Sequence, residues 1–204
     1  MIVIIDYGVG NLFSLASSFK EIGVDVIVSG DKEVIKKADK IILPGVGAFG
    51  DAAEKLFSLG LKEVILEKVK NNVPILGICL GMQLLFDKSL EYGEHEGLGL
   101  IKGEVRPIKE VIPTNLKIPH IGWNALNFGK EKNRLFKYLN EGDYVYFVHS
   151  FYGANCSDSV IATASYGVPL TAAVASGNVY GCQFHPEKSG KAGLNILKAF
   201  CEME

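Results

Sequence analysis

The sequence carries almost no net charge of either sign. Its 21 lysines and arginines nearly balance 23 aspartates and glutamates, which gives a formal charge of -2 and a pI near 6.1. Nucleic acids and anionic membrane surfaces attract proteins that have an excess of basic residues. The balance gives no reason to expect a nucleic acid or a membrane as partner, so the function must be sought in local motifs.

Other features are also missing. The apolar run MIVIID at the N-terminus has no basic region and is too short for a signal peptide or a membrane span, so we expect a cytoplasmic protein. The cysteines are widely spaced and form no C-x-x-C pair, which argues against a zinc site and a disulfide framework. We therefore expect no metal and no other cofactor. The four cysteines are Cys79, Cys156, Cys182 and Cys201.

The first half of the chain alternates short apolar runs with helical patterns. Strand-like runs cover residues 1–6, 24–28, 40–43 and 74–78, and helical patterns cover 11–23, 31–38 and 48–71, the last broken near Gly60. Strands that are apolar nearly throughout and alternate with helices are typical of a parallel sheet covered on both faces. This half predicts a doubly wound α/β fold.

From Gly97 onward the pattern changes. Residues 97–108, 123–128, 144–152, 160–167 and 170–184 are strand-like segments joined by turns, and a helical pattern follows over 189–201. This order predicts an antiparallel C-terminal extension of a mostly parallel sheet. Since no linker or repeat interrupts the chain, we expect a single domain over residues 1–204.

Cys79 lies in the segment Gly77-Ile78-Cys79-Leu80-Gly81, where an expected strand passes into a helix. Ligands of open parallel sheets bind beyond the carboxyl ends of the strands, which is where Cys79 falls. G-x-C-x-G is the thiol counterpart of the nucleophile elbow, in which small flanking residues permit a tight turn. A helix start favours the thiolate and offers the Leu80 N–H to an oxyanion. A small apolar side chain that closes a buried strand is the alternative.

A nucleophilic thiol needs a base, and the segment GCQFHPEKSG supplies a candidate. His185 follows the apolar run 179–184 and Glu187 lies two residues later, so in an extended segment both side chains point to the same face. A carboxylate in that place holds the imidazole in one tautomer and stabilises its charged form. A His-x-Glu sequence in a solvated loop is the alternative. Together with Cys79, the pair predicts a nucleophile, a base and an orienting carboxylate.

A second glycine turn, ILPGVGAFG over residues 42–50, ends the third expected strand next to the elbow. Its backbone amides around Val46 and Gly47 are candidates to complete an oxyanion hole with Leu80. A plain turn, with glycines for geometry alone, is the other interpretation.

Together these motifs resemble the class I, triad-type glutamine amidotransferases. GICLGMQLL, HSFY and CQFHPEKSG match the family's elbow, glutamine-backbone loop and His-Glu segments, and the resemblance covers the whole chain. DYGVGNL, PGVGAFG and IPHIGWN are similar to the free-standing glutaminases that work with a (β/α)₈-barrel cyclase. The resemblance implies an α/β glutaminase with glutamine as substrate and the cyclase subunit as its partner in a heterodimer.

The resemblance also implies roles for single residues. Cys79 attacks the side-chain amide of glutamine, His185 protonates the departing ammonia and then activates water, and Glu187 orients His185. Val46 and Leu80 supply oxyanion amides. The residues implied for the glutamine pocket are Gly47, Gln83, His149, Ser150 and Phe151.

By the same resemblance, the glutaminase is nearly idle until its partner is loaded with ligand. If the Gly45–Val46 peptide presents its carbonyl to the oxyanion, the loss of one donor costs roughly 10²- to 10³-fold in rate. The glycines around Val46 motivate the hypothesis that the loaded partner flips this peptide. Equal glutaminase rates with and without the loaded partner would contradict it.

The partner interface is implied at Asn11, Pro119, His120, Trp123 and Lys188. Trp123, in the loop IPHIGWN, is the only tryptophan of the chain, and tryptophan is an efficient interface anchor. A buried aromatic in the antiparallel extension is the alternative for Trp123. Lys188 resembles a family lysine that pairs with an aspartate of the barrel, and a solvated lysine is its alternative.

Three other functions are compatible with these residues. One is another free-standing triad glutaminase, such as one that serves pyridoxal phosphate or anthranilate synthesis. A cysteine peptidase or related hydrolase of similar fold would cleave peptides rather than glutamine. A regulatory subunit that has only kept the fold would form no adduct at Cys79 with a glutamine-like electrophile.

Overall fold

The structure is a computed structural model that describes residues 1–129 and 131–203. Its first half alternates strands and helices as predicted, and Gly60, at φ 63°, separates the two helices expected around it. The elements of this half are β1 (Ile2–Ile5), α1 (Leu12–Glu21), β2 (Val26–Ser29), α2 (Lys32–Lys36), β3 (Lys40–Leu43), α3 (Phe49–Ser58), α4 (Leu61–Lys70), β4 (Ile75–Ile78) and α5 (Leu80–Leu84).

In the described part of the chain, the main sheet has eight strands in the order β2-β1-β3-β4-β14-β13-β12-β9. The first five are parallel, and the last three continue the same sheet in antiparallel pairing. The additional strands are β9 (Asn127–Phe128), β12 (Val160–Tyr166), β13 (Val168–Ser176) and β14 (Val179–Cys182).

The position of β14 corrects one expectation. The sequence placed residues 179–182 in the antiparallel extension, but β14 pairs parallel with β4 and antiparallel only with β13. Every residue of β14 is buried, as in the other central parallel strands, because helices cover both faces of the sheet at this point. The extension therefore begins at β13.

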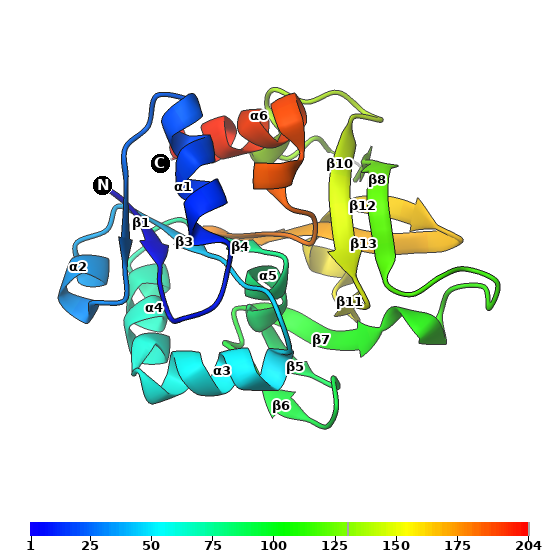
Figure 1. The fold of residues 1–204 in the computed structure, drawn as a ribbon, viewed down its shortest axis with the longest axis horizontal. Helices are drawn as coiled ribbons and strands as arrows, with labels where there is room; N and C mark the ends of the chain where they lie inside the picture. The colour runs from blue at the N-terminus through cyan, green and yellow to red at the C-terminus, as the bar shows by residue number, and fades with distance from the viewer. Residues whose placement is uncertain (130, 204) are drawn as a thin grey trace.

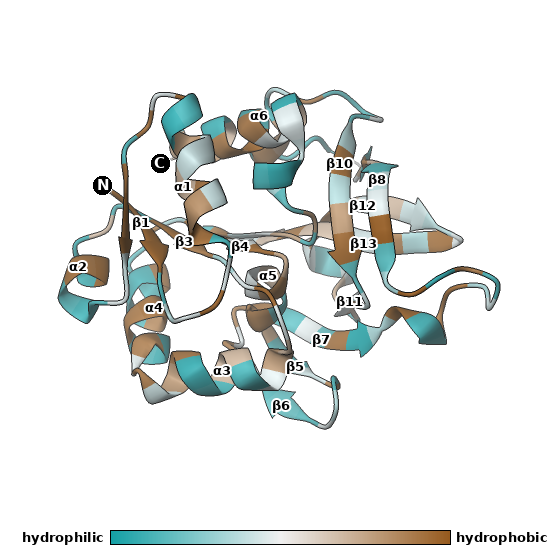
Figure 2. Ribbon diagram, in the orientation of Figure 1, coloured by the Kyte–Doolittle hydropathy of each residue, from teal (hydrophilic) through white to brown (hydrophobic). Residues whose placement is uncertain are grey.

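Helices cover both faces of the main sheet (Figure 1). α1 and α6 (Gly190–Cys201) lie on one face, and α3, α4 and α5 lie on the other. β1 shows why, because its side chains alternate between two cores: Ile2 and Ile4 pack with α1 and α6, whereas Val3 and Ile5 pack with α3 and α4. Figure 2 shows β1 in brown, hydrophobic along its length. The doubly wound α/β fold is confirmed.

The described part of the chain also forms two smaller sheets. One pairs β10 with β8, and the other has the order β11-β7-β5-β6, with β5 and β7 parallel. The expected strand over 144–152 is divided at Ser150, and β5 and β6 were not predicted. The strands are β5 (Phe86–Ser89), β6 (His95–Glu96), β7 (Ile101–Pro107), β8 (His120–Ala125), β10 (Tyr144–His149) and β11 (Phe151–Ala154).

The carboxyl ends of β1, β3, β4 and β14 meet at one edge of the main sheet, because these strands are parallel neighbours. The Tyr7 hydroxyl, after β1, donates to the Pro44 carbonyl, after β3, at 2.8 Å. The Cys79 N–H, after β4, donates to the Cys182 carbonyl at the end of β14, at 2.7 Å. The strand ends are thus joined to one another at the place where such sheets bind ligands.

Of the described helices, none has the length and apolarity to span a bilayer.

Candidate active site

Cys79 occupies a strained turn between β4 and α5. Its backbone, at φ 54° and ψ -111°, lies outside the regions that L side chains favour, at a cost on the order of 1–3 kcal/mol. A Cβ at Gly77 would lie 2.6 Å from the Gly81 carbonyl oxygen, and a Cβ at Gly81 would collide with the carbonyl oxygen of Leu43. Only glycines permit this approach, so the geometry of the elbow is as the G-x-C-x-G pattern predicted.

His185 and Glu187 contact each other directly. Nδ1 of His185 lies 2.8 Å from Oε1 of Glu187, and the two side chains are 3% and 4% exposed. The spacing predicted the contact, but the assumed extended segment is wrong. His185 itself is extended, whereas Pro186–Lys188 forms a 3₁₀ turn that begins with a proline, whose fixed φ suits a helical first turn. The turn brings Glu187 back onto the imidazole.

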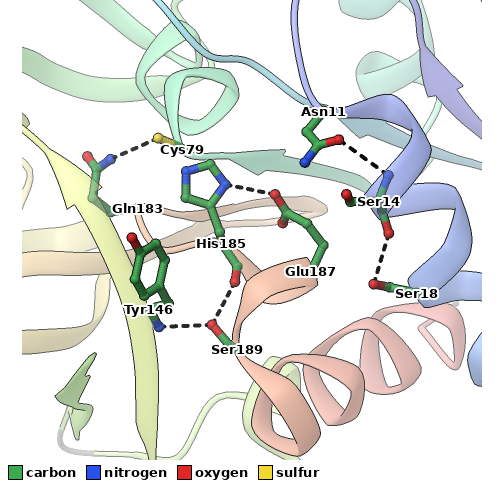
Figure 3. Close-up of polar contacts among 9 residues, drawn as sticks. All are labelled: Asn11, Ser14, Ser18, Cys79, Tyr146, Gln183, His185, Glu187 and Ser189. Carbon is green, nitrogen blue, oxygen red and sulfur yellow. Dashed lines mark hydrogen bonds and ion pairs between the residues drawn. The ribbon is translucent and has the colours of Figure 1, made fainter. Parts of the chain in front are cut away.

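The backbone of His185 is held by β10 and by Ser189. The His185 N–H donates to the Tyr146 carbonyl at 3.0 Å, the Tyr146 N–H donates to the Ser189 hydroxyl at 2.9 Å, and that hydroxyl donates to the His185 carbonyl at 2.6 Å. Figure 3 shows the result: one ring nitrogen of His185 bonds Glu187, and the other side of the ring faces the sulfur of Cys79.

The electrostatics of His185 suit catalysis by a thiol. Burial lowers the pKa of His185, but hydrogen bonds and charges from Cys79 and Glu187 outweigh it and raise the pKa to about 9. The imidazole is therefore charged at neutral pH, and a neighbouring imidazolium favours a thiolate. In such a pair the thiolate is able to attack a carbonyl carbon. The imidazolium, oriented by the carboxylate, then donates a proton to the leaving group.

A cavity of about 350 Å³ opens beside Cys79. Glu187 lies behind His185 and is not part of the lining. Most of the residues implied for the site do line it, namely Val46, Gly47, Cys79, Leu80, Gln83, Pro119, His149, Ser150, Phe151, His185 and Lys188.

An adjacent cavity of about 480 Å³ is larger and shares Glu91 and Tyr92 with the first. It is lined by acidic side chains and His95 and contains neither Cys79 nor His185. The smaller cavity is thus the one in which the thiol meets a ligand. In residues 1–129 and 131–203, no three His, Cys, Asp or Glu side chains are grouped to hold a metal ion.

The turn after β3 packs against the elbow. A Cβ at Gly45 would lie 2.9 Å from the Gly81 nitrogen and from the Leu80 Cβ, so glycine at this position permits the close approach. Gly47 adopts φ 100°, in the region that favours glycine. The turn brings Val46 and Gly47 into the cavity that Leu80 also lines.

His149 is fixed in one tautomer. Its Nδ1 lies 2.8 Å from the Phe151 carbonyl, which only accepts, so Nδ1 carries the proton. Nε2 then accepts from Nδ1 of His120 at 3.0 Å. Burial, together with the charges of His120 and His185, outweighs the opposing effect of the Phe151 carbonyl and lowers the pKa of His149 to about 4. His149 is therefore a neutral wall of the cavity.

The residues expected to face a partner fall into two groups. Asn11 is exposed at the start of α1, where its side chain caps the helix by accepting from the Ser14 N–H (Figure 3), and Pro119 and Lys188 are exposed at the cavity. Trp123 is 54% exposed on β8, so the buried-aromatic interpretation is wrong.

His120 differs from this group and corrects a second expectation. It is 3% exposed, and its ring stacks between those of Phe147 and Tyr166, with ring centroids 5.0 and 4.1 Å away. The prediction that His120 faces the partner is wrong, because side chains alternate along β8 and His120 is on the inward face while Trp123 is on the outward face.

Sequence reasoning missed Glu91, Tyr92 and Val148 in the lining of the cavity, and Gln183, which contacts Cys79 without lining the cavity. Glu91 and Tyr92 belong to the polar loop EYGEHEG, whose composition indicates a solvated turn. Glu91 is nonetheless 7% exposed, accepts from the Phe49 N–H at 2.6 Å, and has its pKa raised by burial. Gln183 lies within GCQFHPEKSG but carries no spacing signal, and its side chain donates to Cys79 Sγ at 3.7 Å.

Comparison with known proteins identifies the family. The chain matches the family model "Glutamine amidotransferase class-I" over residues 3–203. The imidazole glycerol phosphate synthase subunit HisH of Lactococcus lactis subsp. lactis is 52% identical over 202 residues, which are 98% of each chain. The protein of the same name from Aquifex aeolicus is 49% identical, with 97% of this chain and 94% of that one covered.

Solved structures of lower identity share the fold. A crystal structure of a glutamine amidotransferase has a TM-score of 0.76 at 17% identity and covers 98% of this chain and 100% of that one. A structure of PurLQS from Thermotoga maritima has a TM-score of 0.72 at 19% identity, with 98% and 96% covered. From the family match and the full-length relatives, the chain belongs to the class I glutamine amidotransferase family.

Proposed function

We propose that this chain is the glutaminase subunit of an imidazole glycerol phosphate synthase, in histidine biosynthesis. The observation that carries the proposal is that His185 bonds Glu187 on one side of its ring and faces Cys79 on the other, beside a cavity of about 350 Å³. The motifs DYGVGNL, PGVGAFG and IPHIGWN support the particular subunit, as do relatives of that name along the whole chain.

In the first half of the reaction, the Cys79 thiolate attacks the side-chain carbonyl carbon of glutamine. The electron pair of the carbonyl bond moves to oxygen, where backbone N–H groups of Val46 and Leu80 stabilise the negative charge. His185 passes the proton of Nε2 to the departing nitrogen. The carbon–nitrogen bond breaks, ammonia leaves, and a thioester joins Cys79 to the glutamyl group.

In the second half, the now neutral His185 accepts a proton from water, and the oxygen of that water attacks the thioester carbon. The carbon–sulfur bond breaks, glutamate leaves, and the thiolate returns. Glu187 accepts from Nδ1 throughout, so Nε2 always faces the reacting atoms. The net reaction converts glutamine and water to glutamate and ammonia.

The cavity offers groups that fit the rest of glutamine. The α-ammonium of the substrate needs a negative partner, and Glu91 is the carboxylate in the lining of the cavity. Gln83, Ser150 and the backbone of Phe151 provide uncharged polar groups for the remainder. These residues come from three separate segments, so the substrate is held only in the folded chain.

The proposal includes a (β/α)₈-barrel cyclase subunit as partner in a cytoplasmic heterodimer. The barrel would receive ammonia and combine it with a phosphoribulosyl-formimino carboxamide nucleotide, to give imidazole glycerol phosphate and an aminoimidazole carboxamide nucleotide. Its contact surface would include exposed residues at the cavity (Pro119 and Lys188), on β8 (Trp123) and at the start of α1 (Asn11).

The test is a glutaminase assay of the chain alone, with the barrel partner, and with partner plus nucleotide ligand, each repeated with Cys79→Ala. Stimulation in the last mixture, lost in Cys79→Ala, is the expected result. Glutamate release that persists in Cys79→Ala would overturn the assigned nucleophile. Stimulation by a different synthase, and not by the barrel, would overturn the assigned pathway.

A further inference from the structure

Gln183 lies between the proposed nucleophile, Cys79, and Gln83 of the proposed glutamine pocket. It follows β14, where its backbone N–H donates to the Ala172 carbonyl at 2.9 Å, so the sheet fixes its position. Its side chain is fully buried. A buried amide costs free energy unless its donors and its acceptor find partners, so the partners of this amide are informative.

A backbone carbonyl determines which way the amide of Gln183 points. The Phe151 carbonyl can only accept, so the atom of Gln83 that lies 3.2 Å from it is Nε2. The same Nε2 lies 3.0 Å from Gln183, which must present Oε1 there. Nε2 of Gln183 is therefore the atom that lies 3.7 Å from the sulfur of Cys79 (Figure 3).

We propose that Gln183 is a positioning residue that holds the sulfur of Cys79 as a thiolate through this N–H···S hydrogen bond. The inference rests on the proposed function only for the identity of the nucleophile. An N–H donor favours a charged acceptor over a neutral one, so the bond is stronger to the thiolate than to the thiol.

Other groups near the sulfur act differently. His185 also stabilises the thiolate, but it gives up its proton to ammonia during the reaction, and Glu187 acts only through His185. The Tyr7 hydroxyl has its pKa raised by burial and by the charge of Cys79, and it donates to the Pro44 carbonyl. His149 is neutral. The amide of Gln183 donates to the sulfur of Cys79 and does not titrate. It therefore still stabilises the thiolate that leaves when the thioester breaks, whatever the charge of His185.

The test measures the apparent pKa of Cys79 from the rate of its alkylation by iodoacetamide, between about pH 5 and pH 10, with the Cys79 peptide quantified by mass spectrometry. Gln183→Met keeps the length of the side chain and removes the donor, so the apparent pKa is expected to rise by about one unit. Gln183→Glu keeps the acceptor for Gln83 and replaces the donor with an oxygen, which should also raise the pKa.

The matched control is Asn178→Ala. Asn178 lies at the opposite end of β14 and donates to the Val69 and Val73 carbonyls, so its loss removes amide hydrogen bonds away from Cys79. The apparent pKa of Cys79 should not change in this variant. An equal rise in Asn178→Ala and Gln183→Met would show a general effect of destabilisation and overturn the inference.

A second measurement uses the unsubstituted chain, so it does not depend on the folding of a variant. The side-chain amide proton resonances of Gln183 should shift as Cys79 ionises, and this shift should be absent in Cys79→Ala. Resonances that do not respond to Cys79 would overturn the inference.

Neither measurement needs glutamine or a partner. A chain that shows no glutaminase activity even with the barrel partner and nucleotide ligand, but in which Gln183→Met still raises the apparent pKa, would overturn the proposed function and support the hydrogen bond. An active glutaminase in which folded Gln183→Met leaves the apparent pKa unchanged would overturn this inference alone.

Discussion

Main-chain hydrogen bonds, rather than side-chain packing alone, hold Cys79 and His185 of the triad. The Cys79 N–H donates to the Cys182 carbonyl and the Gln83 N–H donates to the Cys79 carbonyl, at 2.7 and 3.1 Å. His185 is fixed in the same way by Tyr146. Because these bonds do not involve the reacting side chains, a substitution at Cys79 or Glu187 should change the chemistry of the site more than its geometry.

The first residue-scale prediction concerns the charge of His185. Its pKa is raised from 6.5 to about 9, with Cys79 as a main cause of the rise. In Cys79→Ala the pKa of His185 should fall toward its ordinary value, as measured by imidazole NMR over a pH titration. Cys201→Ala, on α6, is the matched control and should leave it unchanged. A pKa that stays near 9 in Cys79→Ala would contradict the ion pair.

The same shift sets how stability depends on pH. A group whose pKa is higher in the folded than in the unfolded chain contributes stability that is fully present below pH 6.5 and is lost as pH rises through about 9. The free energy of unfolding contributed by His185 should therefore decline across this window. Urea unfolding at pH values on either side should show a smaller decline in Cys79→Ala.

Glu187→Gln tests the orienting carboxylate. The amide keeps the shape of the side chain but removes the charge that supports the imidazolium, so kcat of the partner-activated enzyme should fall by about 10²- to 10⁴-fold. KM for glutamine should change little, because Glu187 is outside the lining of the cavity. Glu202→Gln, at an exposed carboxylate paired with Lys137, is the control. A change confined to KM would contradict the assigned role.

At the scale of elements, the strands that are continuous apolar runs could be located from the sequence, whereas short polar strands could not. β3 was predicted with its observed bounds and β4 to within one residue, because both are apolar runs next to Pro44 and Pro74. β5, with the sequence FDKS, follows α5 almost directly and buries only its first and last residues. A run so short and polar has no periodicity to detect.

The site residues likewise fall into those that the sequence marked and those that it did not. Cys79, His185 and Glu187 are marked by local patterns, so the sequence was enough to single them out. Glu91 reaches the cavity, and Gln183 reaches the sulfur of Cys79, only because the chain folds them there, and no local pattern in the sequence signals either role. The burial of His120 likewise depends on which face of β8 the fold turns inward.

The contact between the elbow and β3 gives an element-scale prediction. In Gly81→Ala the added Cβ would collide with the Leu43 carbonyl oxygen, which belongs to the sheet and cannot move alone. The free energy of unfolding should fall by about 2 kcal/mol or more in urea titrations followed by circular dichroism. Gly129→Ala is the control, since the nearest atom to its Cβ is 3.7 Å away, and should stay within about 0.5 kcal/mol. Equal stability of the two variants would contradict the close packing.

At the scale of the whole molecule, the sheet of β8 and β10 has apolar residues on its outward face. Trp123 is the register partner of Tyr146, and Ile121 and Tyr144 are 58% and 59% exposed on the same two strands. The inward face buries Val145 and Phe147 together with the polar pair His120 and His149. Exposed apolar side chains gathered on one face of a sheet are typical of a surface that another protein covers.

Trp123→Ala tests whether this face binds the barrel partner. A large aromatic side chain at the centre of an interface often contributes at least about 2 kcal/mol, so the Kd of the complex should rise by roughly 30-fold, as measured by calorimetry. Trp123 is half exposed in the free chain, so its removal should leave the free energy of unfolding nearly unchanged. Leu59→Ala, a similarly exposed apolar residue that ends α3, is the control and should bind normally. This face lies outside the cavity, so its role in binding is tested separately from catalysis. An unchanged Kd together with full activation would show that the partner docks elsewhere. The apolar residues of β8 and β10 would then be exposed for another reason.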